Sequence, residues 1–302
     1  MRRADPSLTN NIKELWLTCF PNESKNYIDY FFNSIYKPED TIIQIRDNKV
    51  VSSLSRVNAE VMINGRIIKT STLIGGATHP NYQGKGYMKE ILNTVCSHFD
   101  HSELISFATT KNPALLQQYG FRTVYRRNRY ELTRDNVSRI TNDGCMFDPS
   151  ALDMLNVYAL FVKRFNGFIV RNLQDFEKYK KGIIDQGGKI VGFYENGVLR
   201  GYASFVIDGK VLHIKECIYL DTMSLFKLLN VALQQRHIVY LNVSEFEKLD
   251  ALLDSANRTV VDYKMARLNN RDLFNRLYNS NVVDVDEIFF TGKKPPYTSE
   301  MF

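Results

Sequence analysis

The sequence predicts a mixed α/β fold made of two tandem domains, each with a mostly antiparallel central sheet flanked by helices. Three observations predict it: strands joined by tight turns over residues 41–78, helices alternating with strands after them, and the same order of elements again beyond residue 150. We therefore expect a first domain over 1–140, a second over 150–268 and a short appendage over 269–302.

The first half begins with two helices and continues with strands. Apolar positions at Ile12, Leu15 and Trp16 have the spacing of one helical face. Asp47-Asn48 and Asn64-Gly65 are turn signals, and the second is typical of a hairpin. The pattern predicts helices over 8–19, 27–36, 87–99 and 113–119, and strands over 41–46, 50–61, 66–78, 104–109 and 121–132.

The second half follows clusters of turn residues at 142–144 and 148–150, which mark the expected domain boundary. A hairpin is indicated by Glu195-Asn196-Gly197, and Asp208-Gly209 indicates a further turn. The pattern predicts strands over 190–194, 198–207, 210–220, 238–243 and 260–268, and helices over 225–235 and 246–254. Residue identity between the halves is poor, so the repeat is one of topology.

Composition narrows the class of protein. The 302 residues are 44% hydrophobic and 24% charged, with a formal net charge of +6, which is typical of a globular chain. No apolar run reaches the length of a membrane span, and no secretory signal follows the basic start. The four cysteines are widely spaced, so we expect reduced thiols, no metal site and a cytoplasmic location.

The segment that carries chemistry runs from a strand end at Thr78 to a helix that begins at Tyr87. Gly84 and Gly86 leave space for backbone N–H groups to converge on an anion, and Lys85 adds positive charge. A structural loop is the alternative. The spacing matches neither a P-loop nor a Rossmann glycine motif, so a pyrophosphate bound without either is the hypothesis.

At these residues the sequence resembles the Gcn5-related N-acetyltransferase (GNAT) superfamily, whose [RQ]xxG[GA] motif corresponds to Gln83-Gly84-Lys85-Gly86-Tyr87. The run Gly75-Gly76-Ala77-Thr78-His79-Pro80 is similar to the enhanced-intracellular-survival (Eis-like) branch. The resemblance implies tandem GNAT-like domains, acetyl-CoA as cosubstrate, no metal, and a second domain that is degenerate. It also implies a sterol-carrier-like C-terminal region, which is truncated here.

The resemblance further implies which residues bind acetyl-CoA. Backbone groups of Gly76 and Thr78 would pair with the pantetheine arm, and the Thr78 N–H would serve as oxyanion donor. Asn112 would hold the cofactor's amide arm, or alternatively cap the helix that starts at Pro113. The complete expected cofactor-binding set is Gly76, Ala77, Thr78, Gln83, Gly84, Lys85, Gly86, Tyr87, Met88 and Asn112.

The sequence departs from the family where proton transfer is expected. Leu116 stands where relatives often have the tyrosine that protonates the leaving thiolate, and Tyr119 is a candidate replacement. In the Eis-like branch the terminal carboxylate reaches into the acetyl-transfer site, so the resemblance makes Phe302 a candidate base, with a frayed tail as the alternative. In the second half, the run 219–225 lacks glycine and contains Asp221, so a pyrophosphate would be repelled there.

These observations predict transfer of an acetyl group from acetyl-CoA to a primary amine, on a small molecule or a peptide, by direct attack in a ternary complex. An acetyl-CoA-binding sensor or scaffold with weakened catalysis is the alternative. Neither a nucleic acid nor a membrane is an expected partner, because no nucleic-acid-binding motif accompanies the basic residues. Association of several copies of the chain stays open.

Overall fold

The computed structural model describes residues 1–110, 112–253 and 255–298. These residues form two compact units. Unit 1 contains Met1–Val124 and Tyr263–Gly292, and unit 2 contains Tyr125–Asp262 together with the segment that begins at Lys293. Each unit is a sheet with helices packed on it, so the predicted fold class is confirmed.

The sheet of unit 1 is antiparallel over its first four strands and then becomes parallel. Strands β1 (Arg2–Arg3), β2 (Thr41–Arg46), β3 (Lys49–Ile63) and β4 (Arg66–Thr78) pair in order. The hairpin turns predicted between them are confirmed, because Asp47, Asn48, Asn64 and Gly65 all have positive φ. Helix α3 (Tyr87–Ser102) then crosses over to β5 (Ile105–Ala108), which pairs parallel to β4.

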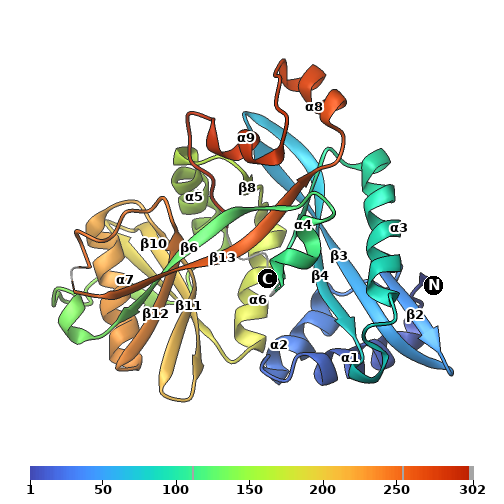
Figure 1. Ribbon diagram of the computed structural model, residues 1–302. Coiled ribbons are helices and arrows are strands. Elements are labelled where there is room, and N and C mark those ends of the chain that lie inside the picture. The colour runs from blue at the N-terminus through green and yellow to red at the C-terminus, as the bar shows by residue number, and fades with distance from the viewer. Residues whose placement is uncertain (111, 254, 299–302) are drawn as a thin grey trace. The chain divides into compact units, whose positions relative to one another are not determined.

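Helices of unit 1 pack against this sheet (Figure 1). Among the described residues, the two N-terminal helices bury one apolar core and α3 buries another. Helix α1 (Thr9–Cys19) and helix α2 (Lys25–Tyr30), which continues as a π-helical turn over Phe31–Ile35, form an aromatic core around Trp16. Helix α3 buries Ile91, Val95 and Phe99 in the other core. The remaining helices of this unit are α4 (Pro113–Gln117), α8 (Arg271–Tyr278) and α9 (Val285–Phe290).

Unit 2 repeats this order of elements. Strands β7 (Cys145–Phe147), β9 (Lys189–Glu195), β10 (Val198–Asp208) and β11 (Val211–Tyr219) pair antiparallel, in that order. Helix α7 (Thr222–Gln235) crosses over to β12 (Ile238–Ser244), which is parallel to β11. The other elements of this unit are α5 (Ala151–Phe161), α6 (Leu173–Asp185) and the two-residue strand β8 (Phe168–Ile169).

The last strand of each unit comes from an unexpected part of the chain. Strand β6 (Arg122–Leu132) follows the first crossover but pairs with β12, from Leu132 opposite Val239 to Arg127 opposite Ser244. Strand β13 (Asn257–Leu268) follows the second crossover, yet its end pairs with β5, with Met265 opposite Ala108. The units therefore divide near residues 124 and 262, and not at the bounds expected from the sequence.

One predicted helix is wrong. Residues 246–253 form single turns, in which Glu247 N–H donates to the Ser244 carbonyl and Leu252 N–H to the Leu249 carbonyl, each at 2.9 Å. The Glu247 carboxylate also accepts a hydrogen bond from Ser244 N–H, so this side chain closes a local turn. Residue 254, the last of the predicted helix, lies outside the described residues. Short 3₁₀ turns elsewhere are Pro6–Leu8, Pro38–Asp40, Pro80–Tyr82, Arg134–Asn136 and Val162–Arg164.

Candidate active site

Strand β4 carries a bulge formed by Gly75 and Gly76. Ala77 pairs with Ser53 and Ile74 pairs with Ser55, so the two glycines oppose the single residue Leu54 on β3. Gly75 has a φ of +65°, the left-handed conformation that glycine adopts at such a bulge. An extra residue in one strand shifts the alternation of its backbone groups beyond that point.

This shift turns backbone groups of β4 away from β3. The His79 N–H donates to the Val51 carbonyl on β3 at 2.9 Å. Because successive residues of a strand point to opposite edges, the N–H groups of Gly76 and Thr78 face the other edge of β4. That edge faces β5 over Thr72 and Leu73, whose partners are Phe107 and Ala108, while β4 continues to Thr78. Strand β5 ends at Ala108, opposite Leu73, whereas β4 runs on to Thr78, and we call this stretch of the β4 edge, which β5 does not cover, the opening.

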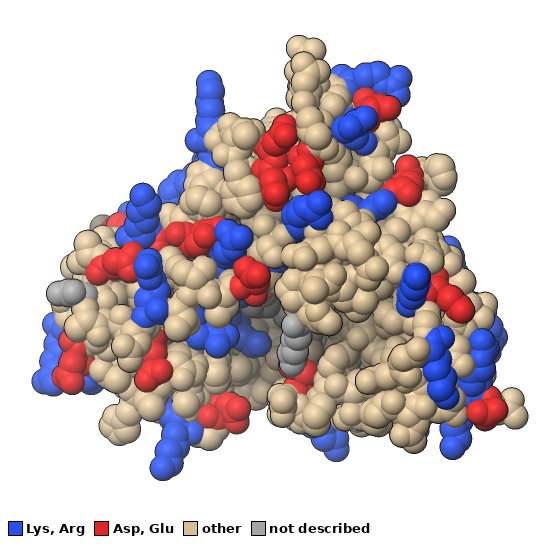
Figure 2. Space-filling model, in the orientation of Figure 1, with Lys and Arg blue, Asp and Glu red and all other residues tan. Residues whose placement is uncertain are grey.

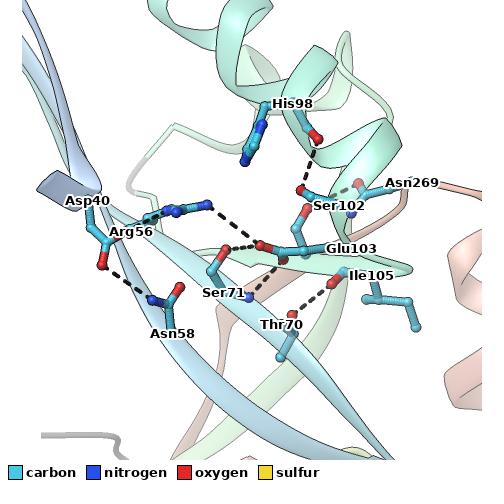
Figure 3. A network of polar contacts seen from close by, with 11 residues as sticks. Asp40, Arg56, Asn58, Thr70, Ser71, His98, Ser102, Glu103, Ile105 and Asn269 are labelled. Carbon is cyan, nitrogen blue, oxygen red and sulfur yellow. Dashed lines mark hydrogen bonds and ion pairs between the residues drawn. The ribbon is translucent and has the colours of Figure 1, made fainter. Parts of the chain in front are cut away.

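A polar cluster fixes the paired end of these strands (Figure 3). The Glu103 carboxylate, at the end of α3, accepts hydrogen bonds from the N–H and the hydroxyl of Ser71 on β4, at 2.9 and 2.7 Å. The Arg56 guanidinium lies 4.0 Å from the same carboxylate and 2.9 Å from Asp40. Burial raises the pKa of Glu103, against the opposing effect of the Ser71 hydrogen bonds. The cluster ties α3, β3 and β4 together at the closed end of the opening.

A glycine-containing loop follows the open end and leads into α3. Gly84 and Gly86 have φ values of +75° and +83°, and a Cβ built on either would meet no atom within 4 Å. Gly86 is the N-cap residue of α3 and no side chain accepts a hydrogen bond there; the first backbone bond described in the helix joins Glu90 N–H to Gly86 O. At the start of α3, the N–H groups of Tyr87, Met88 and Lys89 therefore have no intrahelical acceptor. Such a terminus attracts an anion.

The side chains of this loop hold its shape. Gln83 donates its amide hydrogen to the Thr78 carbonyl at 3.1 Å, which links the loop to the end of β4. The Lys85 ammonium lies 4.9 Å from the centre of the Tyr82 ring, and the Arg46 guanidinium lies 5.0 Å from that of Tyr87. Both cations lie beside the uncapped helix start. The loop thus combines open backbone geometry with positive charge.

The end of β4 has two further neighbours, Ser52 and Cys19, and neither was expected at the site from the sequence. The Thr78 hydroxyl lies 2.9 Å from the Ser52 hydroxyl, which also donates to the Ala77 carbonyl at 2.9 Å. The Cys19 thiol donates to the Thr78 carbonyl at 3.4 Å. Burial raises the pKa of Cys19, so this thiol is protonated at neutral pH and is a poor nucleophile. Only its place at the end of α1 could have drawn attention to it in the sequence.

Met88 contributes a side chain as well as a backbone group. Its Cε lies 3.8 Å from a Cβ built on Gly76, so the thioether packs beside the bulge of β4. Ala77 is buried. The structure therefore brings the expected residues Gly76, Ala77 and Thr78 together with the helix start that follows Gly86.

Asn112, Leu116 and Tyr119 lie on or next to α4. Asn112 occupies the N-cap position of this helix, but its side chain makes no capping hydrogen bond. Leu116 is buried in the core that contains Leu73 and Ala108, and it carries no group for proton transfer. The Tyr119 hydroxyl lies 3.5 Å from the Lys89 carbonyl in the first turn of α3. Burial raises the pKa of Tyr119.

The corresponding helix start in unit 2 is different. The Asp221 carboxylate caps α7 by accepting a hydrogen bond from Ser224 N–H at 2.8 Å, and it pairs with Arg200 at 2.8 Å. Although burial opposes its charge, the hydrogen bonds from Ser224 and Arg200 keep the pKa of Asp221 below its usual value. A negative group already fills the position that an anion would take. Phe302, the other candidate catalytic residue, lies outside the described residues.

Further features concern partners. No helix among the described residues is long and apolar enough to cross a membrane. Within the same part of the chain, no group of three His, Cys, Asp or Glu side chains is arranged to hold a metal ion. Figure 2 shows Lys and Arg side chains interspersed with Asp and Glu side chains on the face drawn.

Comparisons with known proteins bear on the first part of the chain and on the fold. Residues 1–124 match the family described as acetyltransferase (GNAT) domain. No curated protein matches the sequence. Solved structures do match, among them a GCN5-related N-acetyltransferase from Anabaena variabilis, with 16% identity, a TM-score of 0.73, and coverage of 89% of this chain and 72% of that one.

Two other solved structures share the fold. A GCN5-related N-acetyltransferase from Kribbella flavida has 12% identity and a TM-score of 0.69, covering 87% of this chain and 69% of that one. Eis1 from Mycobacterium abscessus has 8% identity and a TM-score of 0.64, covering 88% and 72%. At these identities the likeness concerns the fold. The match of residues 1–124 to an acetyltransferase (GNAT) domain, together with these neighbours, supports an acyltransferase.

Proposed function

We propose that the chain transfers an acetyl group from acetyl-CoA to a primary amine by direct attack in a ternary complex. The observation that carries the proposal is the opening between β4 and β5, with outward-facing N–H groups of Gly76 and Thr78 on one side and the uncapped start of α3 at its end. The thioester of acetyl-CoA would accept hydrogen bonds from the strand N–H groups, and its pyrophosphate would accept them from the N–H groups of the helix start.

The donors fit acetyl-CoA at both of its polar ends. The N–H groups of Gly76 and Thr78, on either side of Ala77, would bind the pantetheine arm, and the Thr78 N–H would stabilise the oxyanion that forms as the amine attacks. Gln83, Gly84, Lys85, Gly86, Tyr87 and Met88 would surround the pyrophosphate. The open space around Gly84 and Gly86 supports this role, because a Cβ at either position would take up ligand space. The side chain of Asn112 makes no capping hydrogen bond at α4, which agrees with a role in binding the amide arm.

The protonated state of the Cys19 thiol beside the site agrees with direct attack by the amine. A covalent acyl-enzyme needs an activated nucleophile, whereas burial keeps Cys19 protonated while it donates to the Thr78 carbonyl. The leaving thiol of CoA has an ordinary pKa of about 8.5, so it needs little help from an acid. With Leu116 in the usual acid position, Tyr119 is the hydroxyl that would supply a proton.

A second candidate function follows from Leu116. A protein that binds acetyl-CoA without turning it over would keep the loop and the bulge and tolerate a buried leucine where an acid is usual. Calorimetric titration with acetyl-CoA, followed by a thiol-release assay on a panel of small and peptide amines, separates the two. We expect binding and thiol release with at least one amine. Binding without release on every amine would favour the sensor, and no binding would exclude both.

A further inference from the structure

Unit 2 also has an opening between its two parallel strands, and a segment of the same unit enters it. Strands β11 and β12 pair from Val211 opposite Ile238 to Ile214 opposite Leu241, and both continue beyond that point. The residues past the last pair line one small cavity with Tyr297 and Thr298. They are Lys215, Glu216 and Cys217 on β11, and Asn242, Val243 and Ser244 on β12.

The backbone of the segment 295–298 is recognised along its length. Asn166 N–H donates to the Pro295 carbonyl and Tyr297 N–H donates to the Asn166 carbonyl, both at 2.9 Å, as in a parallel strand pair. The Ser244 hydroxyl donates to the Pro296 carbonyl at 3.2 Å. The Arg127 guanidinium donates to the Thr298 carbonyl at 3.4 Å. Main-chain bonds of this kind hold extended peptides in sheet-edge binding sites.

Tyr297 anchors the segment. Its ring lies 5.3 Å from that of Phe161 and 4.8 Å from that of Phe165, and the residue is 6% exposed. A cavity of about 10 Å³ remains beside it, which is room for about one water molecule. The preceding Pro295-Pro296 restricts the free chain and so lowers the entropy cost of docking. In peptide complexes, a buried aromatic side chain of this kind often contributes much of the binding free energy.

Charges of both signs line the opening, because Arg127 and Lys215 lie there beside Glu216 and Glu247. Glu216 and Glu247 are both buried and line the cavity. Glu216 accepts hydrogen bonds from Tyr202 at 2.7 Å and Arg171 at 3.0 Å, and Glu247 accepts from Tyr219 at 2.8 Å. Asp221 occupies the nearby helix start. A neutral, extended segment with an aromatic side chain suits these surroundings.

We infer that the β11–β12 opening is a peptide-binding site for extended segments with a Pro-Pro-aromatic core, filled within the chain by Pro295–Thr298. The inference is independent of acetyl transfer in unit 1. Because the segment is tethered, its effective concentration at the site keeps other peptides out. A change that ejects Tyr297 therefore frees the site for a peptide of the same sequence added in solution.

The test uses the full chain with Tyr297→Glu, which places a carboxylate beside Glu216 and Glu247. A fluorescent peptide of residues 293–298 with blocked ends is titrated by anisotropy. We expect it to bind this variant at least tenfold more tightly than the wild-type chain, and to lose tenfold or more when its tyrosine is alanine. Adding Ser244→Ala should weaken binding several-fold. A folded Tyr297→Glu chain that ignores the peptide, or binds the alanine peptide equally, would overturn the inference.

Two further measurements cover the other outcomes. If Tyr297→Glu does not fold, hydrogen exchange on the wild-type chain decides: the Asn166 and Tyr297 amides should be protected together, and rapid exchange at Tyr297 would contradict the inference. Titrating the folded variant with acetyl-CoA tests the ligand class. We expect the same stoichiometry as wild type, because the opening does not accept the cofactor, and a second equivalent bound would show a cofactor site instead.

Discussion

Gly75 and Trp16 are packed so closely that a Cβ built on the glycine would lie 1.7 Å from Cζ2 of the indole. Trp16 is buried and stacks on Phe31, with ring centres 4.5 Å apart. Helix α1 therefore presses a rigid aromatic surface against the bulge that turns Thr78 toward the opening. The bulge and the aromatic core of α1 and α2 depend on each other.

Gly75→Ala should accordingly destabilise unit 1 and weaken acetyl-CoA binding. The methyl group would overlap the indole, and the positive φ would be strained, so we expect a loss of more than about 2 kcal/mol in the free energy of unfolding. Gly76→Ala is the matched control, because its Cβ would lie 3.4 Å from the nearest atom, Leu54 Cδ1. Trp16→Phe should restore part of the stability of Gly75→Ala. Equal stability of the two alanine variants in urea would contradict this account.

A second prediction concerns the loop before α3. Gly86→Asp places a negative charge at the helix start and should weaken acetyl-CoA binding at least tenfold in calorimetry, or about 1.4 kcal/mol. Gly65→Asp is the matched control, since Gly65 has a φ of +85° against +83° at Gly86 and both have open space around a built Cβ. Backbone strain is thus similar in the two variants. Similar affinities in both would place the cofactor elsewhere.

The two interpretations of Asn112 can now be separated. Because its side chain makes no capping hydrogen bond, Asn112→Ala should leave the unfolding midpoint unchanged while weakening acetyl-CoA binding several-fold. Asn172→Ala is the contrasting variant: Asn172 accepts a hydrogen bond from Asp175 N–H at 3.1 Å and caps α6. That change should cost about 1 kcal/mol of stability and leave binding intact. A destabilised Asn112→Ala with normal affinity would return the residue to a structural role.

Glu103 gives a pH dependence with a defined sign. Its pKa in the folded protein is raised by burial, above an unfolded value of about 4.3. The folded state therefore binds a proton more readily, and the contribution of Glu103 to stability falls as pH rises from about 4.3 through the folded pKa. Relative to Glu103→Gln, the wild-type chain should be most stable below about pH 4.3 and should lose stability progressively as the pH rises to 7. Urea unfolding at several pH values, with the exposed Glu60→Gln as control, measures this difference, and a difference that grows with pH would refute it.

Much of the local structure could be predicted because the signals were themselves local. The bounds of β2 and β4 agree with those expected, because the Asp47-Asn48 turn marks the end of β2 and the Asn64-Gly65 turn marks the start of β4. The crossover helix α3 was evident from its periodicity and from Gly86 before it. The helix predicted over 246–254 had helical apolar spacing. In the structure the Glu247 carboxylate accepts a hydrogen bond from Ser244 N–H, and residues 246–253 form turns.

The exchange of β6 and β13 could not be predicted in this way. Each of these strands follows a parallel crossover strand in the sequence, β5 before β6 and β12 before β13. Each also pairs antiparallel with a crossover strand, so the residue pattern of β6 or β13 does not reveal whether its partner is β5 or β12. The role of Trp16 was hidden for a similar reason: its spacing marks a helix face, while its partner Gly75 lies on a strand far along the chain. Pairings that depend on tertiary structure are absent from the pattern of a single segment.

Tyr119 provides the last prediction, on proton transfer to the leaving thiolate. Its hydroxyl lies 3.5 Å from the Lys89 carbonyl, in the first turn of the helix whose start would bind the pyrophosphate. Burial raises its pKa, so the phenol stays protonated across the pH range in which an amine can attack. Tyr119→Phe should therefore lower kcat about tenfold, equivalent to about 1.4 kcal/mol, and leave acetyl-CoA affinity unchanged. The same change at Tyr278, a tyrosine of α8 that stacks on Phe274, controls for the loss of a phenol and should leave kcat intact. Unchanged kcat in Tyr119→Phe would mean that water protonates the thiolate, which its low basicity permits.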